Sequence, residues 1–232
     1  MSKNILLIGG SHGIGFEIAS KLYQDHTVYV ASRTNENLGN LDVNYIEYDT
    51  EKDELDLSQL PDHLDGFVFC PGTINLKPFK MLTVDTFRKD MELNFLSMVN
   101  VVHQVMEHLK KSEQASLVFF STVAVKVGMP FHTSVAAAKG AIEGFAKALA
   151  AEYAPKLRVN VIAPSLTDTP LAKRLLSNDK KKEMMNERHP LKRVGTSEDI
   201  ANAAAFLLGN DSTWITGQVI GVDGGMSTLN VN

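Results

Sequence analysis

The chain has 232 residues, of which 44% are hydrophobic and 22% charged, and its formal net charge is −4. It is long enough to bury one sizeable core, so we expect a single domain over residues 1–232. The mild acidity argues against a nucleic-acid partner, and no apolar run approaches the roughly 20 residues of a membrane span. A single cysteine excludes an internal disulfide. With no signal-peptide pattern at the N-terminus, these features predict a cytoplasmic protein without a membrane partner.

The first strand-like segment runs directly into a glycine-rich turn. Residues 5–8 are all apolar, as in a parallel strand that is buried on both faces. Gly9, Gly13 and Gly15 follow with the spacing G-x-x-x-G-x-G, and an amphipathic helical pattern begins there. Glycines permit a tight turn, leave the backbone open to a pyrophosphate and let the helix pack closely, with its N-terminal amides directed at the phosphates. We predict a dinucleotide site formed by Gly9, Ser11, His12, Gly13, Ile14 and Gly15.

The end of the second strand-like segment, residues 27–32, indicates which dinucleotide binds. An acidic residue at this place would hold the ribose hydroxyls of NAD, whereas this chain has Arg33, whose guanidinium suits a 2′-phosphate. His12 beside the turn would add a second, pH-dependent positive charge. The pattern favours NADP(H) over NAD(H). The alternative is that Arg33 only solvates a strand end and His12 only fills a turn.

The rest of the chain alternates strand-like and helical segments, which is typical of a doubly wound sheet. The predicted fold is therefore α/β: a single-domain Rossmann fold with seven parallel strands and helices on both faces. Five further strands are expected at residues 43–48, 65–70, 115–120, 159–163 and 218–222. Helices are expected at about 84–109, 134–152 and 197–208, with a charged helical segment ending near residue 188.

Several short motifs then follow one another in a characteristic order. They are the glycine turn, Asp49, Asn94, Ser121-Thr122, Lys139, the run Arg158 to Pro164, and the segment from Ile215 to Gly225. In this order and spacing the chain resembles the short-chain dehydrogenase/reductase family, most nearly the 3-oxoacyl-acyl-carrier-protein reductase type, over essentially its whole length. The resemblance implies a nicotinamide cofactor, a small-molecule carbonyl or alcohol substrate, and a homo-oligomer (dimer or tetramer) built through the long helices. It also implies cofactor contacts from Asp49, Thr50, Gly72, Lys139, Pro164, Thr167 and Thr169.

The catalytic residues of that family are a serine, a tyrosine and a lysine, helped by an asparagine, and here the chain departs from the family. The tyrosine belongs four residues before the lysine, where this chain has Val135 before Lys139. The serine belongs thirteen residues before the tyrosine, which is Thr122 in this chain, with Ser121 beside it. Valine cannot exchange a proton, and a positioned general acid is worth about 10²–10⁴ in rate. Standard carbonyl reduction therefore needs another proton donor.

Two residues near the vacant tyrosine position are candidates for that donor. An imidazole suits proton transfer at neutral pH, which makes His132 a candidate; the alternative is an exposed loop histidine. Ser134 is expected to be the N-cap of the helix. Thr122 or Ser121 would orient the carbonyl, and Asn94 would hold a relay water or only pack a helix. The candidate catalytic residues are Thr122, Ser121, Lys139, Asn94 and His132.

Other departures concern the loops around the site. Residues 69–72 read Phe-Cys-Pro-Gly where the family has Asn-Asn-Ala-Gly, and Ser165 follows Pro164 where a glycine is usual. We expect Cys70 to be a buried structural thiol. Residues 166–190 correspond to the family's substrate lid, whose apolar side chains would contact an acyl-like substrate or only pack on the body. No metal site is expected.

Two functions are compatible with these residues. The first is an NADP(H)-dependent oxidoreductase that acts on a carbonyl or alcohol with a non-standard proton donor. The second is a catalytically impaired NADP(H)-binding protein that serves as a sensor, subunit or scaffold. Lys139 and the glycine turn indicate cofactor binding in both functions and discriminate poorly between them. The enzyme is favoured because an intact cofactor frame with Lys139 is more than a scaffold needs, whereas the absent tyrosine argues against it.

Overall fold

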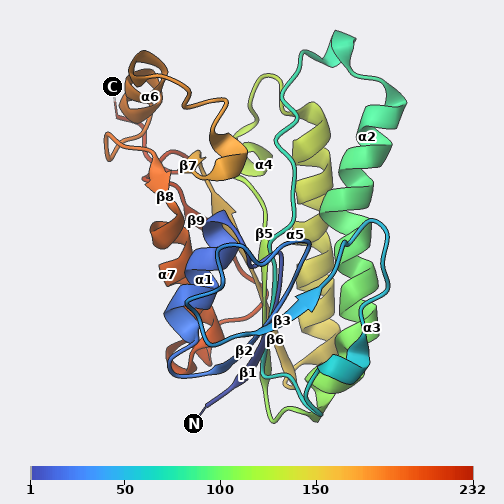
Figure 1. Ribbon diagram of the computed structural model, residues 1–232. Helices are drawn as coiled ribbons and strands as arrows, with labels where there is room; N and C mark the ends of the chain where they lie inside the picture. Colours follow the sequence, from blue (N-terminus) through green and yellow to red (C-terminus); the bar gives the residue numbers. More distant parts are fainter. Residues whose placement is uncertain (1, 232) are drawn as a thin grey trace.

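The computed structural model describes residues 2–231, and its centre is a parallel sheet with helices on both faces (Figure 1). Seven strands of the described chain form this sheet in the order β3-β2-β1-β4-β5-β6-β9. Every neighbouring pair in it is parallel. The predicted doubly wound α/β Rossmann fold is confirmed. The strand order changes direction between β1 and β4, and ligands of such sheets bind beyond the carboxyl ends of the strands at this point.

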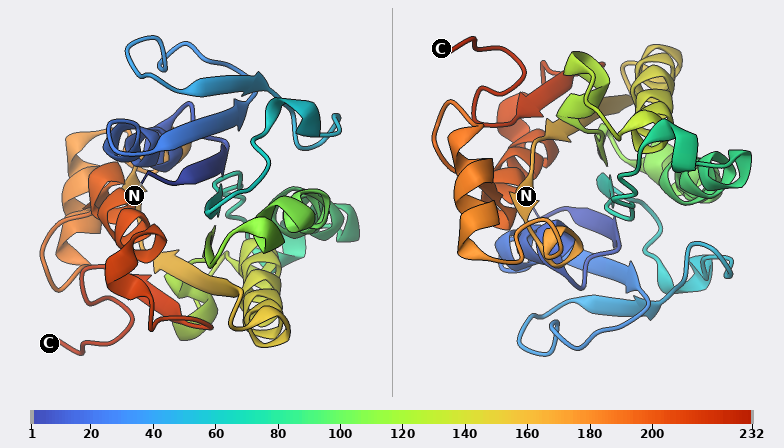
Figure 2. Two further views of the ribbon diagram at one scale, coloured as in Figure 1. Left: turned by 90° about the horizontal axis from the view of Figure 1, so that it is seen from below. Right: turned by 90° about the horizontal axis from the view of Figure 1, so that it is seen from above.

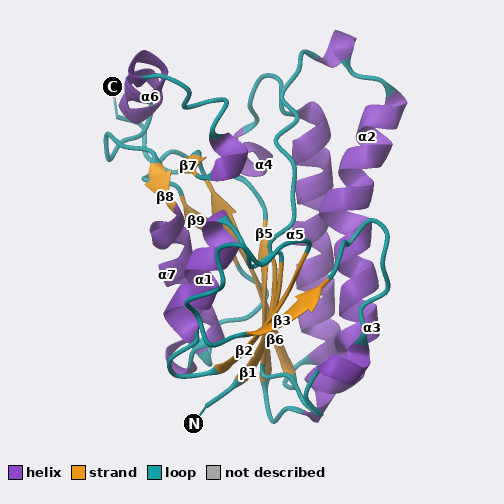
Figure 3. Cartoon of the chain, in the orientation of Figure 1, coloured by secondary structure: helices purple, strands orange, loops and turns teal. Residues whose placement is uncertain are grey.

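The strands of the sheet lie close to the predicted segments. They are β1 (Asn4–Ile8), β2 (Thr27–Ser32), β3 (Asn44–Glu47), β4 (Gly66–Phe69), β5 (Ala115–Phe120), β6 (Leu157–Pro164) and β9 (Val219–Val222). A separate two-residue pair, which the sequence pattern does not predict, joins β7 (Thr167–Asp168) to β8 (Gly195–Thr196) beyond the sheet's carboxyl edge (Figure 3).

The α-helices of the described chain are α1 (Gly13–Leu22), α2 (Val84–Met91), α3 (Ser97–Lys111), α4 (Val123–Val127), α5 (Thr133–Tyr153), α6 (Asp179–Glu187) and α7 (Ser197–Leu208). Short 3₁₀ turns occur at Leu57–Gln59, Phe79–Met81, Pro170–Ala172 and Asn210–Ser212. The charged helical segment is thus shorter than predicted, because a 3₁₀ turn and loop occupy the chain between Pro170 and Asn178.

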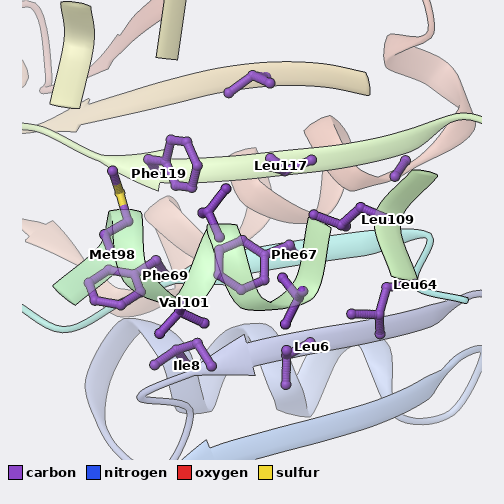
Figure 4. Packing of buried hydrophobic residues seen from close by; sticks show 14 of the residues in the cluster. Leu6, Ile8, Leu64, Phe67, Phe69, Met98, Val101, Leu109, Leu117 and Phe119 are labelled. Atoms are coloured by element: carbon purple, nitrogen blue, oxygen red, sulfur yellow. The ribbon is translucent and has the colours of Figure 1, made fainter. Parts of the chain in front are cut away.

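Successive side chains of the central strands point to opposite faces of the sheet, so the core has two parts. On one face, residues such as Leu6 and Phe67 pack against α3 and α5; the Phe67 and Phe119 rings meet edge to face at 6.3 Å (Figure 4). On the other face, residues such as Leu7 pack against α1 and α7. The end-on views show the sheet between these two helical layers (Figure 2). All-apolar strands follow from burial on both faces.

The long helix predicted over residues 84–109 changes type in its middle. Between α2 and α3, residues Glu92–Leu96 form a π-helical turn with Asn94 completely buried inside it. The Asn94 side-chain amide donates to the Asp90 carbonyl oxygen at 2.8 Å. Such π-turns often occur at functional sites. This one directs Asn94 toward the loop that follows β4.

Candidate active site

A cavity of about 280 Å³ lies at the carboxyl ends of β4, β5 and β6. Ile14 borders it from the glycine turn, and Cys70, Thr122 and Ser165 border it from the segments that follow these three strands. This is the position where open α/β sheets bind ligands. The wall is completed from α5 and from residues 166–190, by side chains that include His132, Val135, Lys139, Leu171, Leu175, Met185 and His189.

The glycine turn has the geometry that the sequence predicts for it. Gly13 lies in the left-handed region at φ = +54°, which favours glycine. A Cβ on Gly15 would lie 2.4 Å from the Gly9 carbonyl oxygen, so the turn requires glycine there. Thr169 is distant in sequence but lies close to this turn in space: a Cβ on Gly13 would lie 3.6 Å from the Thr169 Cβ. These contacts bring the start of α1 close to the Gly9 carbonyl. A glycine turn at a helix N-terminus is the kind of site that suits a diphosphate.

The neighbours of the turn include the residues predicted to read the dinucleotide. Ser11 is buried and its hydroxyl lies 3.0 Å from His12 Nδ1, while His12 is exposed at the N-cap of α1. Arg33 is exposed directly after β2. A hydrogen bond from Lys52 at 2.9 Å is the main cause that lowers the pKa of Asp49, and the charge of Arg33 contributes weakly. The charge of Arg33 thus reaches the Asp49 carboxylate after β3.

The loop after β4 brings Lys139 and Asn94 close to Gly72. A Cβ on Gly72 would lie 3.2 Å from both Lys139 Nζ and Asn94 Oδ1. Burial lowers the pKa of Lys139 to about 8. Burial also raises the pKa of Cys70 to about 12, so this half-buried thiol stays protonated at neutral pH, as a structural thiol would. The Pro71 ring packs against Gly9, because a Cβ on Gly9 would lie only 3.1 Å from Pro71 Cδ.

Asn94 is fixed by the loop and by its own helix. Its Oδ1 accepts from the Thr73 N–H at 3.1 Å, and its Nδ2 donates to the Thr73 hydroxyl at 2.9 Å. With the bond to the Asp90 carbonyl, these contacts tie the loop after β4 to the long helix. A helix-packing role, one of the two alternatives for Asn94, is therefore visible in its contacts.

The two hydroxyls after β5 have different partners. Ser121 donates to Glu143 Oε1 at 2.5 Å. The Thr122 oxygen accepts from the Ala124 N–H at 3.3 Å and caps α4, which leaves the Thr122 proton available to an acceptor in the cavity. Both residues border the cavity. The geometry thus favours Thr122 over Ser121 as the donor that orients a carbonyl.

The prediction that Ser134 is a helix N-cap is wrong. The helix α5 begins at Thr133, and its N-cap is His132, which makes no side-chain capping bond. The Ser134 hydroxyl is buried and donates to Asp90 Oδ2 at 2.5 Å, across to α2. This pairing satisfies a buried carboxylate, which explains why the serine points away from the cavity. The same carboxylate accepts from the Thr73 hydroxyl at 2.9 Å.

His132 and Val135 both face the cavity. His132 is half-buried, not fully exposed, and its Nδ1 lies 2.8 Å from the Pro130 carbonyl oxygen. Val135 is buried one helical turn before Lys139, on the same side of α5. The wall thus presents an aliphatic side chain beside the lysine, where a tyrosine would place its hydroxyl.

The segment after β6 contributes both predicted and unpredicted residues. Pro164 and Thr167 border the cavity together with Thr169, and Thr167 donates to the Ser165 carbonyl oxygen at 3.0 Å. Of the apolar lid residues, Leu175 and Met185 face the cavity, whereas Met184 is exposed. The sequence pattern gave no sign of the contact between Ser165 and His189, because these residues meet only through the fold. Sequence reasoning also missed Asp90; the only sign of it was a charged residue within a predicted long helix.

Comparison with known proteins assigns this fold and site to a family. The profile described as Enoyl-(Acyl carrier protein) reductase matches residues 9–227. A 3-oxoacyl-acyl-carrier-protein reductase of Chlamydia muridarum is 34% identical over 247 aligned residues, which cover 98% of both chains. The chain belongs to the short-chain dehydrogenase/reductase family of oxidoreductases.

Two further relatives bear on its activity. The Inactive 2-(S)-hydroxypropyl-CoM dehydrogenase 2 of Xanthobacter autotrophicus is 33% identical over 171 residues, covering 72% of this chain and 74% of that protein. Among solved structures, ElxO with NADP bound superposes with a TM-score of 0.89 at 25% identity and covers 99% of this chain and 100% of that one. Within residues 2–231, no helix is long and apolar enough to cross a membrane, and no cluster of three or more His, Cys, Asp or Glu side chains is arranged to hold a metal ion.

Proposed function

We propose that this protein is an NADP(H)-dependent oxidoreductase that acts on a small carbonyl or alcohol substrate with a non-standard proton donor. The observation that carries the proposal is the buried Lys139, which faces the same cavity as Thr122 and lies beside Gly72. Burying an ammonium lowers its pKa and destabilises the empty fold. A ligand that hydrogen-bonds to this group would offset the cost, whereas a simple scaffold gains nothing from it.

The chain offers suitable groups for each part of the cofactor. The turn from Gly9 to Gly15 and Thr169 would hold the diphosphate, Arg33 and His12 the 2′-phosphate, and Asp49 with Thr50 the adenine side. Lys139 would hold the nicotinamide ribose, next to Gly72. Pro164 and Thr167 border the cavity where the nicotinamide would lie. Bound NADPH would supply the hydride.

The remaining residues would bind and orient the substrate. Thr122 would orient the carbonyl by donating a hydrogen bond to its oxygen, because the Thr122 oxygen already caps α4. Leu175 and Met185 would cover the apolar part of the substrate. The related Chlamydia enzyme is named for a 3-oxoacyl substrate, which makes an acyl-like carbonyl compound the first class to test. We also propose association into a cytoplasmic homo-oligomer, a dimer or tetramer, which sedimentation at micromolar concentration would detect.

A second function is favoured by one specific observation. The cavity has Val135 where a proton-donating tyrosine would stand in the family, and the Xanthobacter relative is named as inactive. A catalytically impaired NADP(H)-binding protein that serves as a sensor, subunit or scaffold would keep the glycine turn and Arg33. It would need no proton donor.

Titration of the purified protein with NADPH and with NADH, followed by cofactor fluorescence, tests the proposal. We expect NADPH to bind well ahead of NADH, and NADPH to be consumed with at least one simple 3-oxoacyl thioester. Binding without turnover across acyl, cyclic and aromatic carbonyl compounds would favour the impaired protein. Binding of neither nucleotide would contradict both functions.

A further inference from the structure

A hydroxyl–imidazole pair lies in the wall of the candidate site. Ser165 is the first residue after β6, and His189 follows α6; the Ser165 hydroxyl oxygen lies 2.8 Å from His189 Nε2. His189 is 2% exposed. Both residues border the 280 Å³ cavity and also a second cavity of about 130 Å³, which lies between residues 189–199 and the end of β9. The pair therefore stands between the substrate side and a separate space.

The second imidazole nitrogen fixes where the protons are. His189 Nδ1 lies 2.8 Å from the Met185 carbonyl oxygen, which can only accept, so Nδ1 carries a proton. In the neutral ring Nε2 is then an acceptor and takes the Ser165 hydroxyl proton. The Met226 sulfur, 3.1 Å from the Ser165 oxygen, is a weaker acceptor. When the ring is protonated, Nε2 donates instead, and the Ser165 proton is released toward another acceptor.

The other hydroxyls of the cavity have partners that suit this exchange less well. Ser121 and Thr73 donate to the carboxylates of Glu143 and Asp90, and a carboxylate holds no spare proton at its ordinary neutral-pH charge. Thr122 has only a backbone amide against its oxygen. Imidazole is the side chain that both gives and takes a proton near neutral pH. Among these contacts, only that of Ser165 links a hydroxyl to such a group.

We propose that Ser165 exchanges the proton with the substrate oxygen and that His189 restores it. The inference rests on the proposed function, whose cofactor supplies or accepts the hydride. In reduction, the substrate oxygen takes the Ser165 proton as the carbonyl becomes an alcohol. The Ser165 oxygen takes the proton of the His189 imidazolium, which ends neutral and is reprotonated from solvent through the second cavity. Oxidation runs the same transfers in reverse.

Several charged groups lie around His189 and have partners of their own. On α7, Asp199 is held by Arg193 at 2.6 and 2.8 Å, which keeps the pKa of Asp199 far below its usual range. Asp223 accepts from the Gly225 and Ser227 backbone amides at 2.8 and 3.1 Å. Arg188 is adjacent in the chain, and His132 and Lys139 also border the larger cavity. Burial lowers the pKa of Lys139 to about 8, so a pH profile also reports on this group.

The test compares Ser165→Ala, His189→Asn and the double variant with His103→Asn, a control on the exposed side of α3. Turnover of NADPH with the acetoacetyl thioester of N-acetylcysteamine is measured from pH 5.5 to 9, and NADPH affinity by fluorescence. Each single variant should lose about 10²-fold in kcat, with NADPH affinity within twofold of the parent, and the double variant should lose no more. The rate of reduction by the parent should fall as pH rises, and His189→Asn should lack this dependence.

The same substitutions made together with Val135→Tyr test whether Ser165 and His189 act in proton transfer. With a phenol supplied beside Lys139, the same two substitutions should cost less than about threefold. Parent and Ser165→Ala proteins with equal rates and pH profiles would overturn the inference, as would a parent that is inactive while Val135→Tyr turns over. Loss confined to His132→Asn would also overturn it, by assigning the role to His132.

A readout that does not depend on turnover is the imidazole ¹⁵N spectrum of histidine-labelled protein, with His189 assigned by His189→Asn. In the neutral ring, we expect a protonated Nδ1 and an Nε2 signal that shifts in Ser165→Ala. An unshifted Nε2 would overturn the inference even if no probe is reduced. Failure of NADPH to bind would instead contradict the proposed function, so the two failures are distinguishable.

Discussion

The candidate site has two ends that differ in how tightly they are packed: a rigid end at the glycine turn and an adaptable end around Lys139. At the glycine turn, close contacts leave no room for change: a Cβ on Gly15 would collide with the Gly9 carbonyl, and Gly13 has a positive φ. Around Lys139, by contrast, Val135 borders open cavity and hydroxyls approach from three loops. In the proposed function the turn would bind a phosphate through its backbone, while proton transfer would need only a suitable group within reach. The second task can therefore change residues without changing the fold.

The sharpest way to break this comparison is to place a phenol at residue 135, where the resemblance to the family implies a tyrosine. Val135→Tyr should raise kcat for carbonyl reduction about 10- to 10³-fold. A positioned general acid contributes about 10²–10⁴-fold in rate, and we expect the existing hydroxyls to supply part of this already. The physical reason is the position of residue 135 one turn before Lys139, whose ammonium would stabilise a phenolate. The measurement is NADPH consumption, and Val135→Phe is the matched control. Equal rates for the two variants would show that the proton is not limiting.

A second change tests the rigid end. Gly15→Ala should lower the free energy of unfolding by about 3 kcal/mol and abolish NADPH binding, because the new methyl group would force α1 away from β1. Gly144→Ala on α5 is the control: its Cβ would meet open space, and it should gain about 0.5–1 kcal/mol from helix propensity. Urea unfolding measures both. A Gly15→Ala protein of normal stability and affinity would refute the close-packing account.

Lys139 gives a third, pH-dependent test at the adaptable end. Its pKa is about 8 in the fold, against an ordinary 10.5, so the unfolded chain binds more protons between these values. The free energy of unfolding should therefore rise with pH through this window, by about 1–3 kcal/mol. Lys139→Met should lack the rise and be more stable than the parent at pH 7, without cofactor. Lys147→Met, on the exposed side of α5, should keep the parent's pH dependence.

The fold and the glycine turn could be predicted because their signals are local. Apolar runs, alternation of element types and glycine spacing are all read within a few residues, and they correctly predicted the seven parallel strands and the glycine turn after the first of them. The pairs Ser134 with Asp90 and Ser165 with His189 join residues 44 and 24 positions apart, and no periodicity specifies such contacts. Ser134 misled for the same reason: a serine before a helix usually caps it, but a buried carboxylate on α2 was a stronger partner.

Arg33 offers the smallest and most selective test of the glycine-turn end, because in the proposed function it would recognise the 2′-phosphate through a side chain. Arg33→Ala should weaken NADPH binding about 10-fold and leave NADH binding nearly unchanged, since only NADPH carries the 2′-phosphate that a guanidinium can bind in a bidentate manner. Arg88→Ala, on the exposed surface of α2, is the control for net charge. The loss should shrink as salt is raised, because an exposed charge pair is screened. An equal loss for both nucleotides would mean that Arg33 supports the loop after β2 and does not read the phosphate.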